Sequence, residues 1–385
     1  MPLYEGIGLG TEKQPVVIDI GTAYTKFGFA GETGPRCIIS TEVMCQESGR
    51  IKKIFSYSNE EELYSLLVEF IHNLYFRHLL VSPKDRRVVI VESLLCPSVF
   101  RDTLAKVLFR HFEVSSVLFV PSHLVALCTL GVSTALVLDV GYQEAVLIPV
   151  YEGVPVLHAW QAQPLASQAV ESNLRRRLAG PEEGELSPHS RISESTIEDI
   201  KVRTCFVTSF ERAHKITAGQ PDPPPPSVSY QADGSSTVDV PGSARETAYE
   251  ILFEQDGDEM SVSTMVLDAI LKCPVDMRKE LAENILLMGG TTMATGFKAR
   301  LMSELKYLVT TPKYAKHLAI KVFKVHKPPA KENYVAWLGG SIFGGTDVIV
   351  TRSLSKEAYL KENRIPDWAN LMYNCREDDN KSANL

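Results

Sequence analysis

The chain has 385 residues, more than the roughly 250 to 300 at which a single hydrophobic core usually stops growing, so two lobes are expected. Apolar residues make up 44% and charged residues 23%, close to the averages of soluble globular proteins, which excludes disordered and fibrous classes. A formal net charge of -7 provides no positive field for a phosphate backbone and argues against a nucleic-acid partner.

Cysteine usage and hydropathy favour an intracellular protein. The seven cysteines are scattered and form no CxxC pair, which argues against a disulfide framework or a zinc site and fits a reducing cytosol. No apolar run approaches the ~20 residues that span a bilayer. The segment from Met1 to Lys13 lacks the apolar core of a signal peptide, so we expect no membrane insertion.

The first part of the chain predicts a hairpin followed by alternating strands and helices. Buried-strand patterns and helical spacing of apolar residues predict these elements in order: a strand within Pro15–Thr22, a returning strand at Lys26–Ala30, a helix at Asn59–Val81 capped by Asn59, a strand at Arg87–Leu94, a helix at Ser98–Phe112 capped by Ser98, a strand at Val114–Val120 and a helix at Ser122–Leu130. Such alternation predicts a largely parallel sheet flanked by helices.

The same pattern then starts again. A second apolar strand ends in Asp139-Val140-Gly141 and is followed by a returning strand at Ala145–Tyr151. Further elements are expected as a helix at Ser261–Leu271, a strand at Asn284–Met288, a helix at Gly296–Leu308, a strand at Ala319–Val325 and a last helix at Asn333–Phe343. Between them lies Pro221–Pro226, whose fixed φ angles and missing N–H groups predict an extended connector.

Two Asp-x-Gly turns at matched positions suggest a phosphate site. In each, an aspartate ends a buried strand and a glycine opens the turn, as in Asp19-Ile20-Gly21 and Asp139-Val140-Gly141. The carboxylates can hold hydrated Mg²⁺, while backbone N–H groups of the turns face phosphates. Thr22 and Lys26 would add a hydroxyl and a point charge. A single turn of this kind is an ordinary strand ending about as often as it is a phosphate site. Its repetition at a matched position favours the phosphate interpretation.

A third motif, Met288-Gly289-Gly290-Thr291-Thr292-Met293, links a buried strand to a helix. Paired glycines let a ligand approach the backbone, and a helix amino end favours polar or anionic groups. A simple strand-to-helix turn is the alternative interpretation.

Together these segments resemble the actin and actin-related protein family. The two hairpins, running through Lys26-Phe27-Gly28-Phe29-Ala30-Gly31 and Pro149-Val150-Tyr151-Glu152-Gly153, are similar to its two phosphate hairpins. Gly289-Gly290-Thr291-Thr292-Met293 resembles its adenosine segment, and Trp337-Leu338-Gly339-Gly340-Ser341-Ile342 resembles its closing helix. The motifs occur in the family's order over nearly the whole chain.

The resemblance implies an α/β, actin-like fold, that is, a duplicated ribonuclease H-like fold with two lobes, a nucleotide cleft and a reduced subdomain 2 near residues 38–58. The first lobe would comprise 1–131 with 333–385, and the second 132–332. The implied ligand is ATP or ADP with Mg²⁺. Carried over residue by residue, the implied nucleotide contacts are Asp19, Gly21, Thr22, Lys26, Asp139, Gly141, Lys201, Gly289, Gly290, Thr291 and Met293, with Asp19 and Asp139 holding Mg²⁺ through water.

Departures from the family pattern argue against an enzyme. Tyr142 and Gln143 stand where active actins carry an acidic residue and a glycine, and Val146 stands where they place a histidine that orients the attacking water. Lys201, within Glu198-Asp199-Ile200-Lys201-Val202-Arg203, carries over as a base or ribose contact, although Val202 replaces the usual acid. We therefore expect nucleotide binding with slow or absent hydrolysis.

A second departure concerns assembly. The stretch from Ile38 to Ser58 is too short for the family's inserting subdomain, and Ser40–Arg50 is expected as its only loop. The resemblance then implies a cytoplasmic, cytoskeletal hetero-oligomer subunit that caps the pointed end of the actin-like filament of dynactin, the activator of dynein transport on microtubules. The implied partners are the filament of actin-related protein one and the other pointed-end subunits.

Three alternatives remain open. The first is a nuclear actin-related subunit of a chromatin remodeller, although the chain has no basic import cluster. The second is a sugar kinase of the same superfamily, which requires a catalytic carboxylate and a sugar site. The third is a scaffold that binds no nucleotide.

Overall fold

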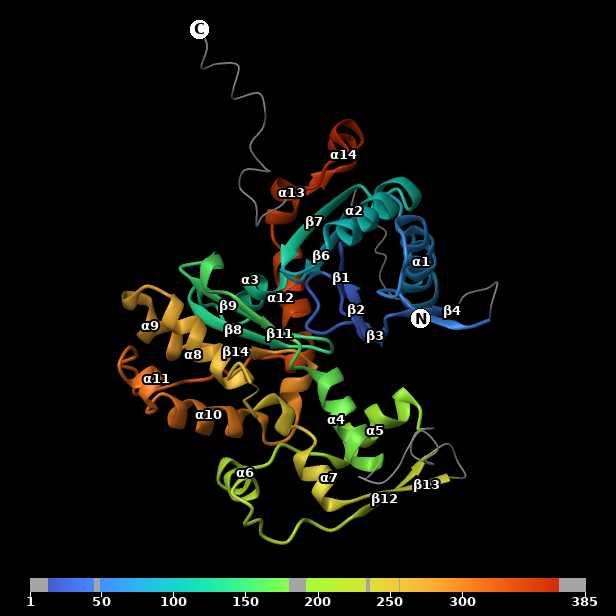
Figure 1. Cartoon of the computed structure of the whole chain (residues 1–385). Helices are drawn as coiled ribbons and strands as arrows, with labels where there is room; N and C mark the ends of the chain where they lie inside the picture. The colour runs from blue at the N-terminus through green and yellow to red at the C-terminus, as the bar shows by residue number, and fades with distance from the viewer. Residues whose placement is uncertain (1–12, 45–48, 180–191, 233–235, 256, 367–385) are drawn as a thin grey trace. The chain divides into compact units, whose positions relative to one another are not determined.

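The computed structural model describes residues 13–44, 49–179, 192–232, 236–255 and 257–366 (Figure 1). The chain divides into two compact units. The first is discontinuous and combines Met1–Thr129 with Ala336–Leu385, and the second is Leu130–Val335. In the described ranges, none of the helices combines the length and the apolar character needed to cross a bilayer.

A six-stranded sheet in the order β15-β7-β6-β1-β2-β3 forms the centre of the first unit. Strands β1, β6 and β7 are parallel, whereas β2, β3 and β15 pair antiparallel with their neighbours. A separate pair, β4 and β5, follows β3. The strands are β1 (Val16–Ile20), β2 (Tyr24–Phe29), β3 (Cys37–Ser40), β4 (Glu42–Met44), β5 (Ile51–Lys53), β6 (Arg87–Glu92), β7 (Ser116–Pro121) and β15 (Leu354–Ser355).

Helices cover both faces of this sheet because its central strands are apolar on both sides. Val16, Ile18 and Ile90 join the core formed with α1 and α2, while Val17 and Val91 lie on the opposite face, against α12. Asn59 caps α1 by accepting a hydrogen bond from the Glu62 N–H at 2.9 Å, as predicted. The helical segments are α1 (Glu60–Asn73), η1 (Leu74–Leu79), α2 (Ser98–Lys106), η2 (Val107–His111), α3 (Ser122–Cys128), α12 (Val335–Gly344), α13 (Val348–Arg352) and α14 (Lys356–Glu362).

Small residues let α12 approach the sheet closely. A Cβ on Gly340 would lie 2.5 Å from Val91 Cγ2, and a Cβ on Gly344 would lie 2.9 Å from Val89 Cγ2. The same helix carries the fully buried Trp337, whose indole N–H donates to the Val17 carbonyl of β1 at 3.1 Å. This bond joins residues 320 positions apart and ties the late helix to the first strand.

The second unit repeats the hairpin arrangement of the first. Its sheet has the order β10-β9-β8-β14, with β11 also paired to β9. Strands β8 and β9 form an antiparallel hairpin like β1 and β2, and β14 pairs parallel to β8 as β6 does to β1. A two-stranded ribbon, β12 and β13, is separate. The strands are β8 (Ala135–Val140), β9 (Ala145–Tyr151), β10 (Val154–Pro155), β11 (Gln161–Gln163), β12 (Val228–Ala232), β13 (Ser236–Val240) and β14 (Ile285–Met288).

The helices of the second unit enclose a large apolar core that includes Leu136, Leu138 and Met265. Ser261 caps α8 and exchanges hydrogen bonds with Thr264 in a capping box. The helical segments are η3 (Leu157–Ala159), α4 (Ser167–Ala179), α5 (Glu194–Thr204), α6 (Phe210–Thr217), α7 (Gly242–Thr247), η5 (Glu250–Leu252), α8 (Val262–Lys272), α9 (Val275–Ala282), η6 (Gly290–Met293), α10 (Phe297–Leu308), α11 (Pro312–Ala315) and η7 (Glu332–Tyr334).

Three local predictions were wrong. Ser98 is the first helical residue of α2 rather than its cap, because Pro97 occupies the cap position and no side chain caps the helix there. Within Ala319–Val325 only Val325 forms a bridge, to Ile285, since the buried side chains Ile320 and Phe323 fill the core without a strand ladder. Ser40–Arg50 is not purely a loop, because it contains β4, although residues 45–48 lie outside the described ranges.

Candidate functional site

The hairpin of the first unit brings Asp19 and Lys26 together. They are opposite each other in the β1–β2 register, and Lys26 Nζ lies 3.2 Å from Asp19 Oδ2. Both side chains are 15% exposed, so the pair is largely buried but reachable. A carboxylate and an ammonium at the end of a buried strand supply the two charges that a magnesium polyphosphate requires.

The turn between these strands is held by hydrogen bonds. The Gly21 N–H donates to the Tyr24 carbonyl at 3.2 Å, and a Cβ on Gly21 would lie 2.8 Å from that oxygen, which explains the glycine. The Thr41 hydroxyl donates to the Gly21 carbonyl at 2.7 Å and lies 2.9 Å from the Thr25 hydroxyl. Thr22 is half-buried within the turn. Sequence reasoning missed Thr41, because its position beside the turn depends on the pairing of β2 with β3.

In the second unit, Gly289 lies directly against the second Asp-x-Gly turn. Its φ of +92° and ψ of 150° belong to a region that is essentially restricted to glycine. A Cβ there would overlap the Val140 carbonyl and the Asp139 carboxylate. Met288 pairs with Asp139 in the parallel register of β14 and β8, so the two predicted motifs end at the same edge of the sheet.

Thr291 joins the same two motifs by a hydrogen bond. Its hydroxyl donates to the Gly141 carbonyl at 2.6 Å, which fixes η6 to the second hairpin. A Cβ on Gly290 would meet nothing within 4 Å, so backbone at this position is open to a ligand. Met293 ends η6 with 43% of its surface exposed. The segment Gly290–Met293 is thus fixed to the second hairpin while its backbone at Gly290 stays accessible.

Lys201 lies in a buried polar cluster that sequence reasoning did not foresee. Its ammonium lies 2.6 Å from Glu171 Oε1 and donates to the Ser167 hydroxyl, and the residue is 6% exposed. Tyr142, one of the departures from the family pattern, donates to Glu171 Oε2 at 3.3 Å. Burial, with the Glu171 charge adding to it, raises the pKa of Tyr142 above its ordinary value. Glu171 therefore links the second turn to Lys201.

The start of α4 contacts both this cluster and the second Asp-x-Gly turn. The N–H groups of Ser167 and Gln168 donate to the carbonyls of Gly141 and Tyr142 at 3.3 and 2.8 Å. Ser167 and Glu171 are four residues apart on one helix face, a spacing that could have suggested a shared partner. Lys201 could not be identified as that partner from the sequence, because it lies 30 positions from Glu171 along the chain.

Val146 lies on β9 directly opposite Asp139. The side chain is 3% exposed and carries no polar atom. Next to it in the turn, the Gly141 N–H donates to the Glu144 carbonyl at 3.1 Å, and burial raises the pKa of the Glu144 carboxyl. An isopropyl group at position 146 cannot hold or activate a water molecule.

Each unit therefore assembles its own part of the predicted residues. The first unit brings together Asp19, Gly21, Thr22 and Lys26 on one hairpin. The second brings Asp139, Gly141, Gly289 and Thr291 into contact and connects them to Lys201 through Tyr142 and Glu171. In the first unit, the largely buried pair of Asp19 and Lys26 offers the two charges that suit phosphate and hydrated Mg²⁺. In the second unit, the backbone at Gly290 is open to a ligand.

Such a repeated hairpin with aspartates at equivalent strand ends defines a class of protein, and comparison with known families identifies it. The family model described as Actin matches residues 10–365, so the chain belongs to the actin family, and the predicted actin-like fold is confirmed. The chain is 28% identical to actin-related protein 10 of Dictyostelium discoideum, over 93% of this chain and 90% of that protein.

Proposed function

We propose that this chain is a non-catalytic actin-related subunit that retains ATP or ADP with Mg²⁺ and caps the pointed end of the actin-like filament of dynactin. In this role it would act in the cytoplasm, within the cytoskeleton, and support dynein-driven transport on microtubules. The observation that carries the proposal is the combination of two intact Asp-x-Gly hairpins with the apolar Val146 opposite Asp139. The similarity to an actin-related protein 10 supports it.

The hairpins suit retention of a nucleotide rather than turnover. Lys26 supplies a positive charge for phosphate oxygens, and Asp19 and Asp139 supply acceptors for the water shell of Mg²⁺. Bound Mg²⁺ would neutralise phosphate charge. Val146 cannot accept a proton from a water molecule or orient it, so we expect the nucleotide to act as a structural ligand that stabilises the folded state by mass action.

The shortness of residues 38–58 supports the pointed-end role. Among the described residues of this stretch, β4 and β5 have only three residues each. A subunit that lacks an inserting subdomain can join a filament end without offering the next subunit a place to bind. The remaining partners of the proposal are the filament of actin-related protein one and the other pointed-end subunits.

Nucleotide retention is tested by acid-quenching the purified full-length protein and separating the supernatant by ion exchange. We expect about one adenine nucleotide per chain, because a tightly bound ligand survives purification. Asp139→Asn should lower that content. Asp276→Asn is the matched control, since Asp276 is an exposed aspartate in the first turn of α9. An empty wild-type protein would mean a scaffold without nucleotide and would overturn this part of the proposal.

The assembly role is tested separately by purifying the endogenously tagged chain and identifying what co-elutes in stoichiometric amount. The proposal requires actin-related filament and pointed-end subunits of dynactin. Co-elution with a chromatin-remodelling ATPase would instead favour the nuclear alternative. Phosphate transfer from ATP to a sugar, measured in a coupled assay, would favour the kinase alternative.

A further inference from the structure

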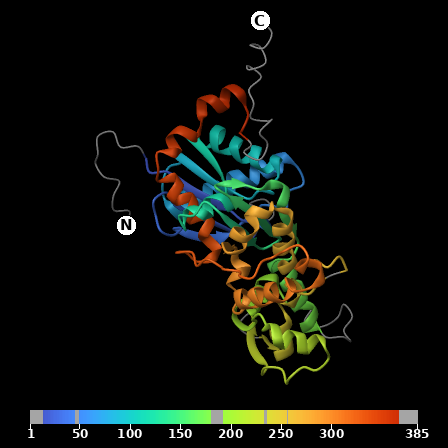
Figure 2. The same cartoon turned by 90° about the vertical axis from the view of Figure 1, so that its left-hand side faces the viewer.

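The proline-rich segment is an exposed, extended ridge on the second unit. Pro221, Asp222, Pro223, Pro224 and Pro226 are all exposed, and no helix or strand is assigned between α6 and β12. Figures 1 and 2 both show this yellow-green stretch at the outer margin of its unit. Proline fixes its own φ near −65° and restricts the preceding residue to extended conformations, so the run favours a polyproline II helix.

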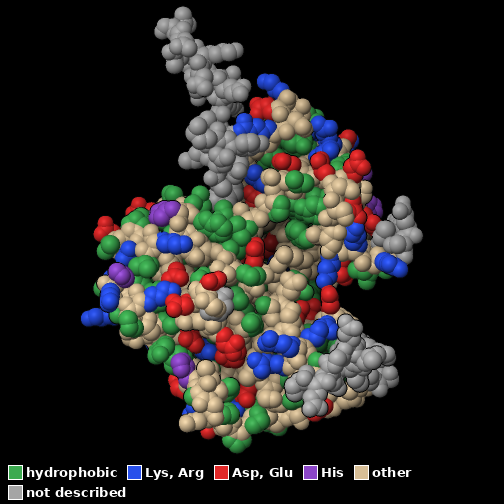
Figure 3. Space-filling view, viewed as in Figure 1, with side chains coloured by type: hydrophobic (Ala, Val, Ile, Leu, Met, Phe, Trp, Pro, Cys, Tyr) green, Lys and Arg blue, Asp and Glu red, His purple; other side chains and the backbone are tan. Residues whose placement is uncertain are grey.

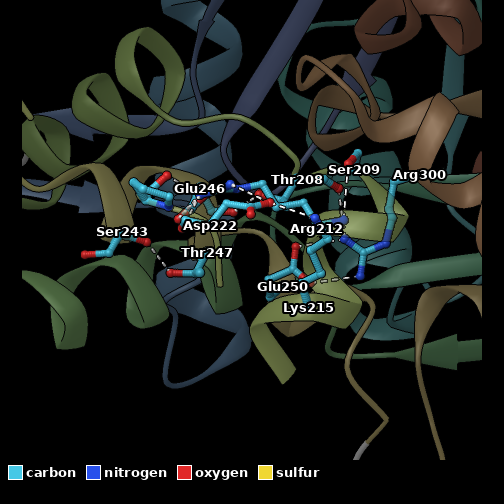
Figure 4. Close-up of polar contacts among 11 residues, drawn as sticks. Thr208, Ser209, Arg212, Lys215, Asp222, Ser243, Glu246, Thr247, Glu250 and Arg300 are labelled. Carbon is cyan, nitrogen blue, oxygen red and sulfur yellow. Dashed lines mark hydrogen bonds and ion pairs between the residues drawn. The ribbon is translucent and has the colours of Figure 1, made fainter. Parts of the chain in front are cut away.

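Two arginine side chains donate hydrogen bonds to backbone carbonyls of this ridge. Arg212 donates to the carbonyls of Asp222 and Pro223 at 3.3 and 2.9 Å, and Arg245 donates to the Pro226 carbonyl at 2.6 Å. Arg212 is itself oriented by Glu246, whose Oε2 lies 2.5 Å from its Nε (Figure 4). A plain linker would need no such anchors. These contacts reduce the conformational entropy that a partner would otherwise have to remove on binding.

The anchors also define which edge of the ridge faces the protein. Asp222 Oδ2 lies 2.9 Å from Lys215 Nζ. Pro225 packs against the start of α7, where a Cβ on Gly242 would overlap the Pro225 carbonyl. Pro225 therefore defines the inward edge, and in a polyproline II helix, which has three residues per turn, Asp222 lies on the same edge with its side chain still exposed. Pro225 is accordingly the one proline of the run that is only partly exposed.

The other two edges then face outward. One carries Pro221 and Pro224, and the other carries Pro223 and Pro226. Each pair has the PxxP spacing, in which prolines three apart enter adjacent pockets of an aromatic-lined groove. We propose that Pro221–Pro226 is a docking site for a partner protein whose domain has such a groove, of the SH3, WW or EVH1 type. The site is distinct from both hairpins and does not depend on nucleotide or on filament binding.

The test titrates purified SH3, WW and EVH1 domains, as a panel, against the immobilised full-length chain. At least one domain should bind the wild type. Pro224→Ala should weaken that binding by about tenfold, equal to about 1.4 kcal/mol, because it removes an outward ring. Pro225→Ala is the matched control: it removes an identical ring from the inward edge and should change the affinity by less than about threefold.

A third variant tests the anchoring. Arg245→Ala leaves every proline in place but releases the Pro226 carbonyl, so it should also weaken binding. Thermal unfolding of each variant checks its folding. A free, unsubstituted peptide of residues 218–229 should compete with the wild-type chain, but only at higher concentration, because it lacks the arginine anchors. Absence of binding by the whole panel, equal losses for Pro224→Ala and Pro225→Ala, or failure of the peptide to compete would each overturn the proposal.

Discussion

Lys26 Nζ lies 3.2 Å from Asp19 Oδ2 across the first hairpin, so the two charges proposed to meet a magnesium nucleotide satisfy one another in the protein alone. A ligand must therefore offer both groups better partners than they offer each other. Phosphate oxygens for the ammonium and hydrated Mg²⁺ for the carboxylate meet this condition.

Asp19→Asn should reduce the rise in melting temperature that Mg·ATP produces, because the amide retains the shape of the carboxylate but not its charge. The comparison is the shift with and without Mg·ATP, in which the basal effect of the substitution cancels. For the wild type, ligand at 100 times its Kd corresponds to about 2.7 kcal/mol. Glu61→Gln, an exposed carboxylate at the start of α1, serves as the control. An unchanged shift in Asp19→Asn would argue against this role.

Gly289, which precedes η6, and Gly290, its first residue, should respond differently to substitution by alanine. Gly289→Ala should lower the free energy of unfolding by about 1 to 3 kcal/mol or more, since its φ of +92° is strained for alanine and its Cβ would overlap the second hairpin. Gly290→Ala has space for the methyl group and should stay within about 0.5 kcal/mol of wild type. Urea unfolding measures both.

The same pair tests the ligand site. If a nucleotide approaches the backbone at Gly290, then Gly290→Ala should lower the nucleotide content of the purified protein although its stability is unchanged. Equal nucleotide content in Gly290→Ala and wild type would place the ligand elsewhere.

Arg300 is the centre of a buried ion cluster. Its guanidinium contacts both Glu250 oxygens at 2.9 Å and also donates to the Thr208 carbonyl (Figure 4). The same guanidinium contacts Glu304 Oε1 at 2.8 Å. Arg300→Leu would leave two buried carboxylates unpaired and should cost about 3 to 5 kcal/mol at neutral pH. Lys313→Leu, which breaks the exposed pair with Glu259, should cost no more than about 1 kcal/mol.

The loss in Arg300→Leu should depend on pH. Burial raises the pKa of Glu250, and hydrogen bonding and charge from Arg300 oppose that rise. Without Arg300 the folded-state pKa rises further above the unfolded value, so the folded variant binds protons more tightly than its unfolded chain. The deficit is therefore largest above the folded-state pKa and shrinks as the pH falls through it. A deficit that grows on acidification would contradict this account.

Trp337→Phe should destabilise the first unit by about 1 to 3 kcal/mol, since it removes the indole donor to the Val17 carbonyl and replaces a fully buried ring by a smaller one. Trp160→Phe makes the same chemical change at a side chain that is 40% exposed and should have little effect. Thermal unfolding of the two variants compares them directly.

Much of the fold was predictable, because apolar strands ending in Asp-x-Gly recur in the sequence and local signals such as Asn59 and Ser261 mark helix starts. The π-helical turns η1 and η2 were not predictable, since their wider turns are selected by packing rather than by residue type. Within the site, the charged and glycine residues followed from their motifs. The engagement of Lys201 by Glu171 did not, because it joins two helices through tertiary contact.

The surface of the described residues is consistent with the absence of a general basic field in the sequence. Acidic and basic side chains are interspersed over the face drawn in Figure 3. Association with a partner therefore has to come from local geometry, such as an anchored proline ridge, rather than from long-range attraction.

The return of α12 and β15 to the first sheet has a consequence for synthesis on the ribosome. Leu354 pairs with Val117, and Trp337 bonds to Val17, so the amino-terminal unit is completed only after the last part of the chain has emerged. The continuous middle unit has all of its residues earlier and can close first. Until α12 emerges, the sheet face that it covers stays open, and exposed apolar surface of this kind favours aggregation.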